Sequence, residues 1–137
     1  MPHDETAREV EAWLARARQD IRAAGVDLDA RPPLLADAAF HCQQAVEKAL
    51  KAFLTHHEHR FRATHDIAEL SMACLTYEPA LERLLREAAP FTEYAWRFRY
   101  PGEVFEPDHD EVEAALATAT EVIDAVVAAM DDSAARA

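Results

Sequence analysis

The sequence predicts an all-α protein, an antiparallel up-and-down helical bundle of four long helices plus one short helix. Only two of its 137 residues are glycine, and half of them are hydrophobic. Apolar residues recur at spacings of three and four along most of the chain, which is the period of helices that bury one face. No run alternates polar and β-branched residues as a half-buried strand does. We expect one domain, residues 1–137, with its core between about residues 7 and 130.

The first helix is expected from about residue 5 to residue 24, where Gly25 is a natural stop. Its apolar side chains share one face: Val10, Trp13, Leu14, Ala17 and Ile21. The second helix is expected to begin at Pro32 and Pro33, which can open a helix but cannot lie inside one. It runs to about residue 57 and is predicted to be the longest and most buried element.

The next two helices are shorter or interrupted. Thr64 offers a cap for a short third helix, and a fourth helix begins near Pro79. Pro90 lacks a backbone donor, so a kink is expected there before a last stretch that ends near residue 98. Residues 99–107 contain a proline and a glycine and are predicted to be irregular.

The final helix is expected to begin at Asp108, because Glu111 three residues later completes a capping-box pattern. It ends near Met130, and residues 131–137 are predicted to form a frayed tail. Short connections between the helices favour antiparallel neighbours.

Charge is spread unevenly along the chain. The formal net charge of −12 argues against a broad nucleic-acid-binding face, which needs clustered Lys and Arg. Residues 39–66, however, contain four cations against three acids, and five of the seven His. This segment is either chance variation in composition or a local anion-binding patch on an acidic body.

The cysteines and the N-terminus bear on the compartment. Cys42 and Cys74 fall on apolar helix faces and form no disulfide framework, so we expect two buried thiols in a reducing cytosol. The first residues have neither the basic start nor the apolar run of a signal peptide, and no segment has the 18 or more apolar residues of a spanning helix. We therefore expect a cytoplasmic protein that is not bound to a membrane.

One polar row on the second predicted helix is the first candidate site. At 100° per residue its five members share one stripe: Asp37, His41, Gln44, Lys48 and Thr55. A separate stripe carries the apolar residues Leu35, Ala38, Cys42, Val46, Ala49 and Phe53. A bundle helix needs the apolar stripe for packing, whereas a His, an amide and an ammonium group on the other stripe have no packing role. The polar row is therefore a candidate for binding.

Two further clusters are candidates. Thr64, His65 and Asp66 begin the third predicted helix, where backbone donors suit an anion, although the same residues also suit a simple N-cap. A second cluster combines aromatic rings with guanidinium groups and consists of Tyr94, Arg97, Arg99 and Tyr100. It suits base stacking and phosphate pairing, and it suits a protein interface better still, because Tyr, Trp and Arg are enriched there.

The sequence lacks the residue spacing that several other kinds of site require. The histidines at 56, 57 and 59 do not form the His-Glu-x-x-His pattern of a zinc peptidase, and no two helices carry the Glu-x-x-His pairs of a di-iron bundle. Two isolated glycines cannot build a phosphate-binding loop. We expect no metal site and no cofactor.

Three segments carry a resemblance to a known family: 40–52 (Phe-His-Cys-Gln-Gln-Ala-Val-Glu-Lys-Ala-Leu-Lys-Ala), 64–70 (Thr-His-Asp-Ile-Ala-Glu-Leu) and 94–101 (Tyr-Ala-Trp-Arg-Phe-Arg-Tyr-Pro). With them the chain resembles the HEPN domain family (higher eukaryote and prokaryote nucleotide-binding) over about residues 7–130. The resemblance implies an up-and-down helical bundle, usually a homodimer, often encoded in bacteria and archaea beside a minimal nucleotidyltransferase.

Many members of that family are metal-independent ribonucleases of toxin–antitoxin systems, with an Arg, four to six residues and then a His near the start of the last helix. Here Arg97 and Arg99 are followed only by His109, with eleven and nine residues between. Arg60 and His65 do have four residues between them, but they precede the third helix. The chain therefore resembles a branch that lacks the ribonuclease motif.

The expected function is a non-catalytic or weakly catalytic module that binds a nucleotide or RNA phosphate and acts with a partner such as a minimal nucleotidyltransferase. Gln44, Lys48 and His65 are expected to contact the ligand, with Arg97 and Arg99 pairing with phosphate. Tyr100 is available for stacking. Two alternatives are a toxin-type ribonuclease with a non-standard His and Arg pair, in which His65 is the catalytic candidate, and a structural dimer module in which the partner subunit covers Gln44 and Lys48.

Overall fold

The structure, a computed structural model, describes residues 2–95 and 106–136, with the side chains of 2, 3 and 136 left out. These residues are helical throughout their regular elements, and no strand occurs among them. The elements in chain order are α1 (Pro2–Asp29), α2 (Leu35–His56), α3 (Ile67–Tyr77), the 3₁₀ turn η1 (Pro79–Leu81), α4 (Glu82–Ala88), the 3₁₀ segment η2 (Ala89–Ala95) and α5 (His109–Arg136). The predicted all-α fold is confirmed.

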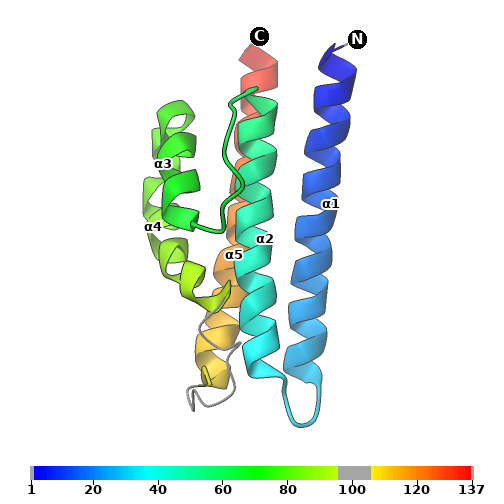
Figure 1. Cartoon of the computed structure of the whole chain (residues 1–137), viewed down its shortest axis with the longest axis vertical. Coiled ribbons are helices and arrows are strands. Elements are labelled where there is room, and N and C mark those ends of the chain that lie inside the picture. The colour runs from blue at the N-terminus through cyan, green and yellow to red at the C-terminus, as the bar shows by residue number, and fades with distance from the viewer. Residues whose placement is uncertain (1, 96–105, 137) are drawn as a thin grey trace.

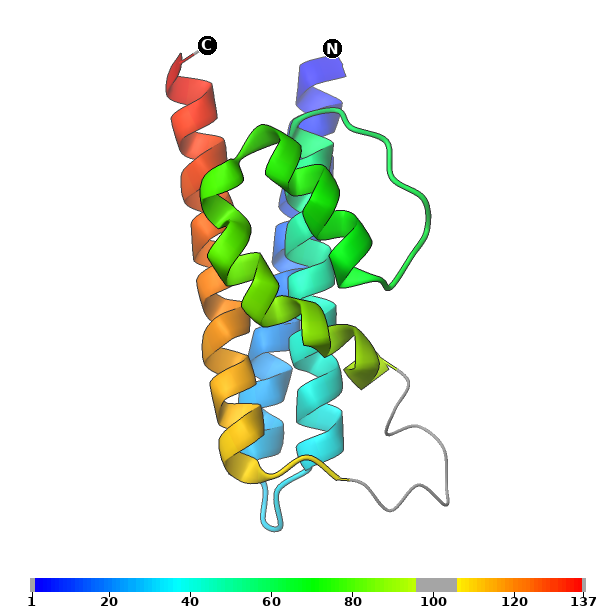
Figure 2. The same ribbon diagram turned by 90° about the vertical axis from the view of Figure 1, so that its left-hand side faces the viewer.

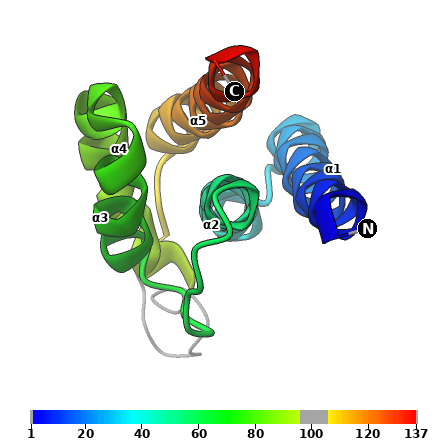
Figure 3. The same cartoon turned by 90° about the horizontal axis from the view of Figure 1, so that it is seen from above.

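Helix α2 is the centre of the bundle. The long helices α1, α2 and α5 run along the long axis, and α1 and α2 form an antiparallel hairpin (Figure 1). Seen from above, α1, α5 and the α3–α4 layer surround α2 (Figure 3). From the side, α3 rises and α4 descends across the bundle before α5 returns to the end that holds both termini (Figure 2).

The composition of α2 explains its central place. Small buried side chains occur along its length and let neighbouring helices approach closely: Ala38, Ala39, Cys42, Ala45, Ala49 and Ala52. Larger side chains then fill the space toward its C-terminal end, where Leu50, Phe53 and Leu54 are almost fully buried. As predicted, α2 is the most buried element, although α1 and α5 are longer.

Two predicted helix ends were wrong. Helix α1 continues through Gly25 to Asp29, because one interior glycine costs only about 1 kcal/mol against the packing of a long hairpin. Helix α5 continues to Arg136 instead of fraying from residue 131. Its last turns line a groove with the start of α1, in which Met130 and Asp131 lie near Thr6 and Val10.

The shorter elements also differ from the prediction in detail. The fourth helix is α-helical for only seven residues. Pro90, which lacks a backbone N–H, lies in the 3₁₀ segment that follows and not at a kink within a longer helix. Asp66, not Thr64, caps α3, since its side chain accepts from the backbone N–H groups of Ala68 and Glu69. The predicted cap of the last helix is present, with Asp108 Oδ1 accepting from Glu111 N at 2.7 Å.

Both cysteines are buried and free. Burial raises the pKa of each thiol to about 12, helped at Cys42 by the charge of Asp20, so both are unreactive. Among the helices described, none combines the length and the apolar character that crossing a membrane requires.

Candidate ligand-binding site on helix α2

The first polar face of α2 is a buried cluster around Glu47. Gln43, Glu47 and Lys51 follow one another at a spacing of four, so they share one face, and all three are buried. The connection between α2 and α3 lies against this face and brings His65 to it. We call Gln43, Glu47, Lys51 and His65 the Glu47 cluster.

The Glu47 carboxylate joins the cluster. Its Oε1 accepts from Gln43 Nε2 at 3.0 Å and lies 2.7 Å from His65 Nδ1, while its Oε2 accepts from Lys51 Nζ at 2.8 Å. The Gln43 amide also donates to the His65 carbonyl oxygen at 3.3 Å. A buried charge of this kind is tolerated only when its lone pairs are filled, as they are here.

The same bonds set the charge of Glu47. Burial alone acts to raise the pKa of its carboxyl, but hydrogen bonds from Lys51, His65 and Gln43 outweigh burial and lower that pKa. The Lys51 ammonium group lies 5.4 Å from the centroid of the Trp13 ring and 5.9 Å from that of Phe61. The two aromatic rings therefore lie against the ion pair of Lys51 with Glu47, which carries no net charge.

One ring nitrogen of His65 is bonded inside the protein, and most of its side chain is exposed to solvent. Its side chain is 71% exposed although its Nδ1 is bonded to the buried Glu47. A carboxylate at Nδ1 favours the tautomer with the proton on that nitrogen, which leaves Nε2 to accept a proton or, once protonated, to donate to an anion. Among the residues that the structure describes, nothing bonds to His65 Nε2. The ring is suited to contact a ligand.

The second polar face is the row predicted from the helical period, and it turns toward α1. Two members of the row bond to the carboxylate of Asp20 in α1. His41 Nδ1 lies 2.8 Å from Asp20 Oδ1, and Lys48 Nζ donates to Asp20 Oδ2 at 2.6 Å. Asp37 lies near the other ring nitrogen of His41, at 3.5 Å. Thr55, the last member, is buried. The row therefore bridges two helices of the bundle.

The structure separates two residues that were expected to act together. Gln44 reaches the Glu47 cluster, because its Nε2 donates to Gln43 Oε1 at 2.7 Å. Lys48 instead faces Asp20, and its side chain is only 20% exposed. The predicted residues Arg97, Arg99 and Tyr100 lie outside the described residues.

Sequence reasoning missed Gln43, Glu47 and Lys51 as site residues. They could have been found as three polar residues at a spacing of four within the helix that was expected to be the most buried element. Such a set has to be satisfied by something that folds onto it.

Cations and a small pocket lie on the α2–α3 connection that carries His65. The α2–α3 connection carries exposed Arg60, and exposed Arg62 donates to Glu69 at 2.7 Å. Both arginines line a pocket of about 230 Å³ against α3, together with Thr64. That volume suits a phosphate group or a base more than a whole drug-sized ligand. A larger groove, of about 500 Å³ between the ends of α1, α2 and α5, has the acidic side chains Glu11 and Asp131 in its lining and suits an anion less well.

Comparison with known proteins gives one match. The family model described as HEPN domain matches residues 10–130. No curated protein and no solved structure is significantly similar to the chain. The matched range contains α2, the α2–α3 connection and His65, and a HEPN domain suggests a function related to nucleotides or RNA.

Proposed function

Because the chain belongs to the HEPN domain family, we propose that it is a non-catalytic or weakly catalytic module that binds the phosphate of a nucleotide or of RNA. The observation that carries the proposal is the 2.7 Å contact between the buried Glu47 and the exposed His65. It holds in place one imidazole of the α2–α3 connection, which also carries Arg60 and Arg62.

The charge of the Glu47 cluster suits a phosphate. Lys51 neutralises Glu47 inside the protein, so protonation of His65 adds a positive charge that no buried acid cancels. Arg60 adds a second cation on the same connection, and the Gln44 amide lies one hydrogen bond away through Gln43. Phosphate oxygens accept from donors of these kinds.

Lys48 was expected to contact the ligand, but we leave it out of the proposed ligand contacts. The Lys48 ammonium group is already paired with Asp20. It would bind a phosphate less strongly than an unpaired ammonium group, because the pair with Asp20 would have to break first. We therefore assign Lys48 to the α1–α2 interface. Arg97, Arg99 and Tyr100 stay predicted contacts.

The partner and the homodimer rest on family membership. A minimal nucleotidyltransferase is the expected partner, and an acidic chain with a net charge of −12 suits a partner with a basic docking face. Co-purification with the product of an adjacent nucleotidyltransferase gene tests the partner. Light scattering of the isolated chain tests the dimer.

Phosphate binding is tested by fluorescence anisotropy with a short labelled single-stranded RNA. We expect His65→Ala to weaken binding about tenfold or more, because a charge-assisted hydrogen bond is worth about 1.5–3 kcal/mol. His109→Ala is the matched control, since His109 is also an exposed histidine near a carboxylate, Glu113, at the start of a helix. Equal affinities of the wild type and His65→Ala would remove the assignment.

The same contact supports one catalytic alternative. An Nδ1–H held by a carboxylate leaves Nε2 as a base for the proton of an RNA 2′-hydroxyl. The 2′-oxygen would then bond to the adjacent phosphorus, the bond from phosphorus to the 5′-oxygen would break, and that oxygen would take a proton from water or from His65. Incubation of the RNA with the protein in EDTA separates the two functions. Cleavage that disappears in His65→Ala supports a metal-independent ribonuclease, and intact RNA supports binding alone.

A further inference from the structure

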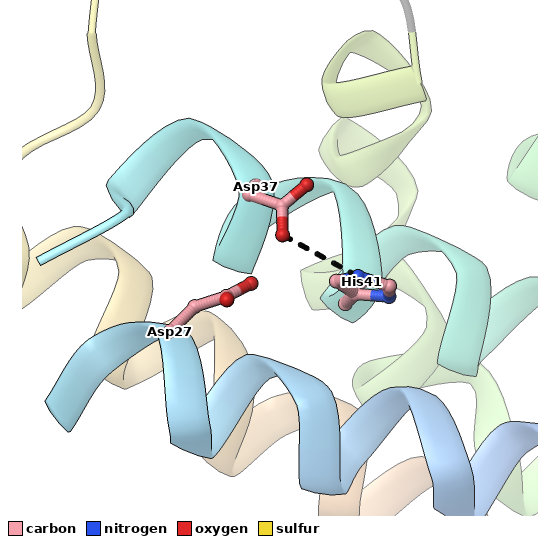
Figure 4. Close-up of side chains that lie close together, drawn as sticks. All are labelled: Asp27, Asp37 and His41. Carbon is pink, nitrogen blue, oxygen red and sulfur yellow. Dashed lines mark ion pairs between the residues drawn. The ribbon is translucent and has the colours of Figure 1, made fainter. Parts of the chain in front are cut away.

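Three ligating side chains meet at the α1–α2 interface, away from the Glu47 cluster. Asp27 comes from the end of α1, and Asp37 and His41 come from the first two turns of α2. Each offers one ligating atom, and these atoms all lie within 4.8 Å of one another. Figure 4 shows the three side chains directed toward a common point between the two helices.

Asp27 is incompletely satisfied. The residue is 8% exposed, and its Oδ2 is buried with no hydrogen-bond partner in the described part of the chain. Its carboxyl group points across the interface toward Asp37 and His41 (Figure 4). A buried oxygen without a donor is unfavourable, so its position indicates a ligand that fills it.

His41 is oriented as a metal ligand usually is. Its Nδ1 lies 2.8 Å from Asp20 Oδ1, and the other oxygen of Asp20 accepts from Lys48 Nζ at 2.6 Å. A carboxylate at one ring nitrogen fixes the tautomer and directs the other nitrogen to an ion. That other nitrogen, Nε2, is the one near Asp37.

The charge of the site calls for a cation. Asp20, Asp27 and Asp37 supply three carboxylates around the His41 imidazole, against the single ammonium group of Lys48. A divalent cation between Asp27 and Asp37 would offset the repulsion between their carboxylates.

We propose that Asp27, Asp37 and His41 bind one divalent transition-metal ion of the Zn²⁺ type. The ligands are His41 Nε2 and one oxygen of each aspartate, with water in the remaining position. Mixed imidazole and carboxylate donors suit Zn²⁺ and its neighbours, whereas Mg²⁺ and Ca²⁺ prefer oxygen alone.

The distances fit such an ion with little movement. Bonds of about 2.0–2.1 Å to a tetrahedral Zn²⁺ place two ligand atoms about 3.3 Å apart. His41 Nε2 and Asp37 Oδ2 are 3.5 Å apart, and the ligating oxygen of Asp27 lies within 4.8 Å of both. The Asp37 side chain is 57% exposed, which gives an ion access from solvent. Once bound, the ion would join the end of α1 to the start of α2.

The test is calorimetric titration of the EDTA-treated, dialysed full chain with ZnCl₂. We expect one ion per chain in the wild type and at least a hundredfold weaker binding in Asp27→Asn and in Asp37→Asn. Asp20→Asn, which acts through His41, should weaken binding 10–100-fold. Asparagine keeps the shape of the side chain, and melting curves in EDTA confirm that each variant folds.

A second, exposed cluster provides the matched control. His109, Asp110 and Glu113 also bring ligating atoms together, but all three are exposed. His109→Ala should leave the Zn²⁺ affinity unchanged. Titration with CoCl₂ should give visible absorption typical of a four-coordinate ion, and Asp27→Asn should abolish it. Absence of one-to-one binding in the wild type, or unchanged affinity in Asp27→Asn, overturns the proposal.

Discussion

The two polar faces of α2 use the same residue types and reach different electrostatic states. In the Glu47 cluster one buried carboxylate bonds to a lysine and a histidine. On the other face Asp20 also bonds to a lysine and a histidine, but Asp27 and Asp37 add two more carboxylates. The pKa of Glu47 is lowered, and that of Asp27 is raised. Charge balance, more than residue type, separates a satisfied cluster from one that needs a cation.

The largest effect is expected from Glu47→Ala. It leaves Lys51 and Gln43 buried without their main partner, so the free energy of unfolding should fall by about 3–5 kcal/mol in urea denaturation. Glu69→Ala is the control, because Glu69 also bonds to a cation, Arg62, but in an exposed pair. That variant should lose much less stability than Glu47→Ala. Similar losses in the two variants would show that the Glu47 cluster is not a buried network.

The pH dependence should have opposite signs at the two faces. Glu47 has a lowered pKa in the folded state, so its stabilisation is complete above its ordinary value of 4.5 and is lost as the pH falls below it. Asp27 has a raised pKa, so its contribution, measured in EDTA, decreases as the pH rises from about 4 to about 6.

Asp27→Asn isolates the second of these effects. In EDTA at neutral pH it should raise the free energy of unfolding by about 1–2 kcal/mol, because an amide carries no charge to bury or to repel Asp37. The gain should disappear near pH 4 in chemical denaturation, where Asp27 of the wild type is protonated. A variant less stable than the wild type at neutral pH would contradict this description of Asp27.

The smallest effect is expected from Lys48→Ala. Its pair with Asp20 is partly exposed, so we expect a loss of about 1 kcal/mol in the free energy of unfolding. RNA affinity should change by less than about twofold, because Lys48 faces α1 and not His65. Anisotropy measured beside His65→Ala checks this, and a comparable loss in the two variants would return Lys48 to the ligand contacts.

The fold was largely predictable because it depends on the spacing of apolar residues. The errors arose where packing outweighed local preference, as at Gly25 inside α1 and beyond residue 131 in α5. The residues of these two segments do not by themselves indicate that a neighbouring helix stabilises them.

The candidate site was predictable only in part. His65 and Gln44 were predicted from their positions, and the structure places His65 in the Glu47 cluster and Gln44 in contact with it. The partners of the polar row were not, because Asp20 and Asp27 belong to another helix and the helical period of α2 says nothing about them. A spacing test for metal ligands within one helix likewise misses a set divided between two helices.

The central claim is that Glu47 holds His65 so that Nε2 meets the ligand. It is tested most directly by ¹H–¹⁵N NMR of the histidine side chains during titration with a short single-stranded RNA. We predict an Nδ1–H tautomer at His65 in the free protein, lost in Glu47→Gln, and a shift of the His65 Nε2 resonance on RNA binding. RNA binding that shifts other histidines and leaves His65 Nε2 unmoved would contradict the claim.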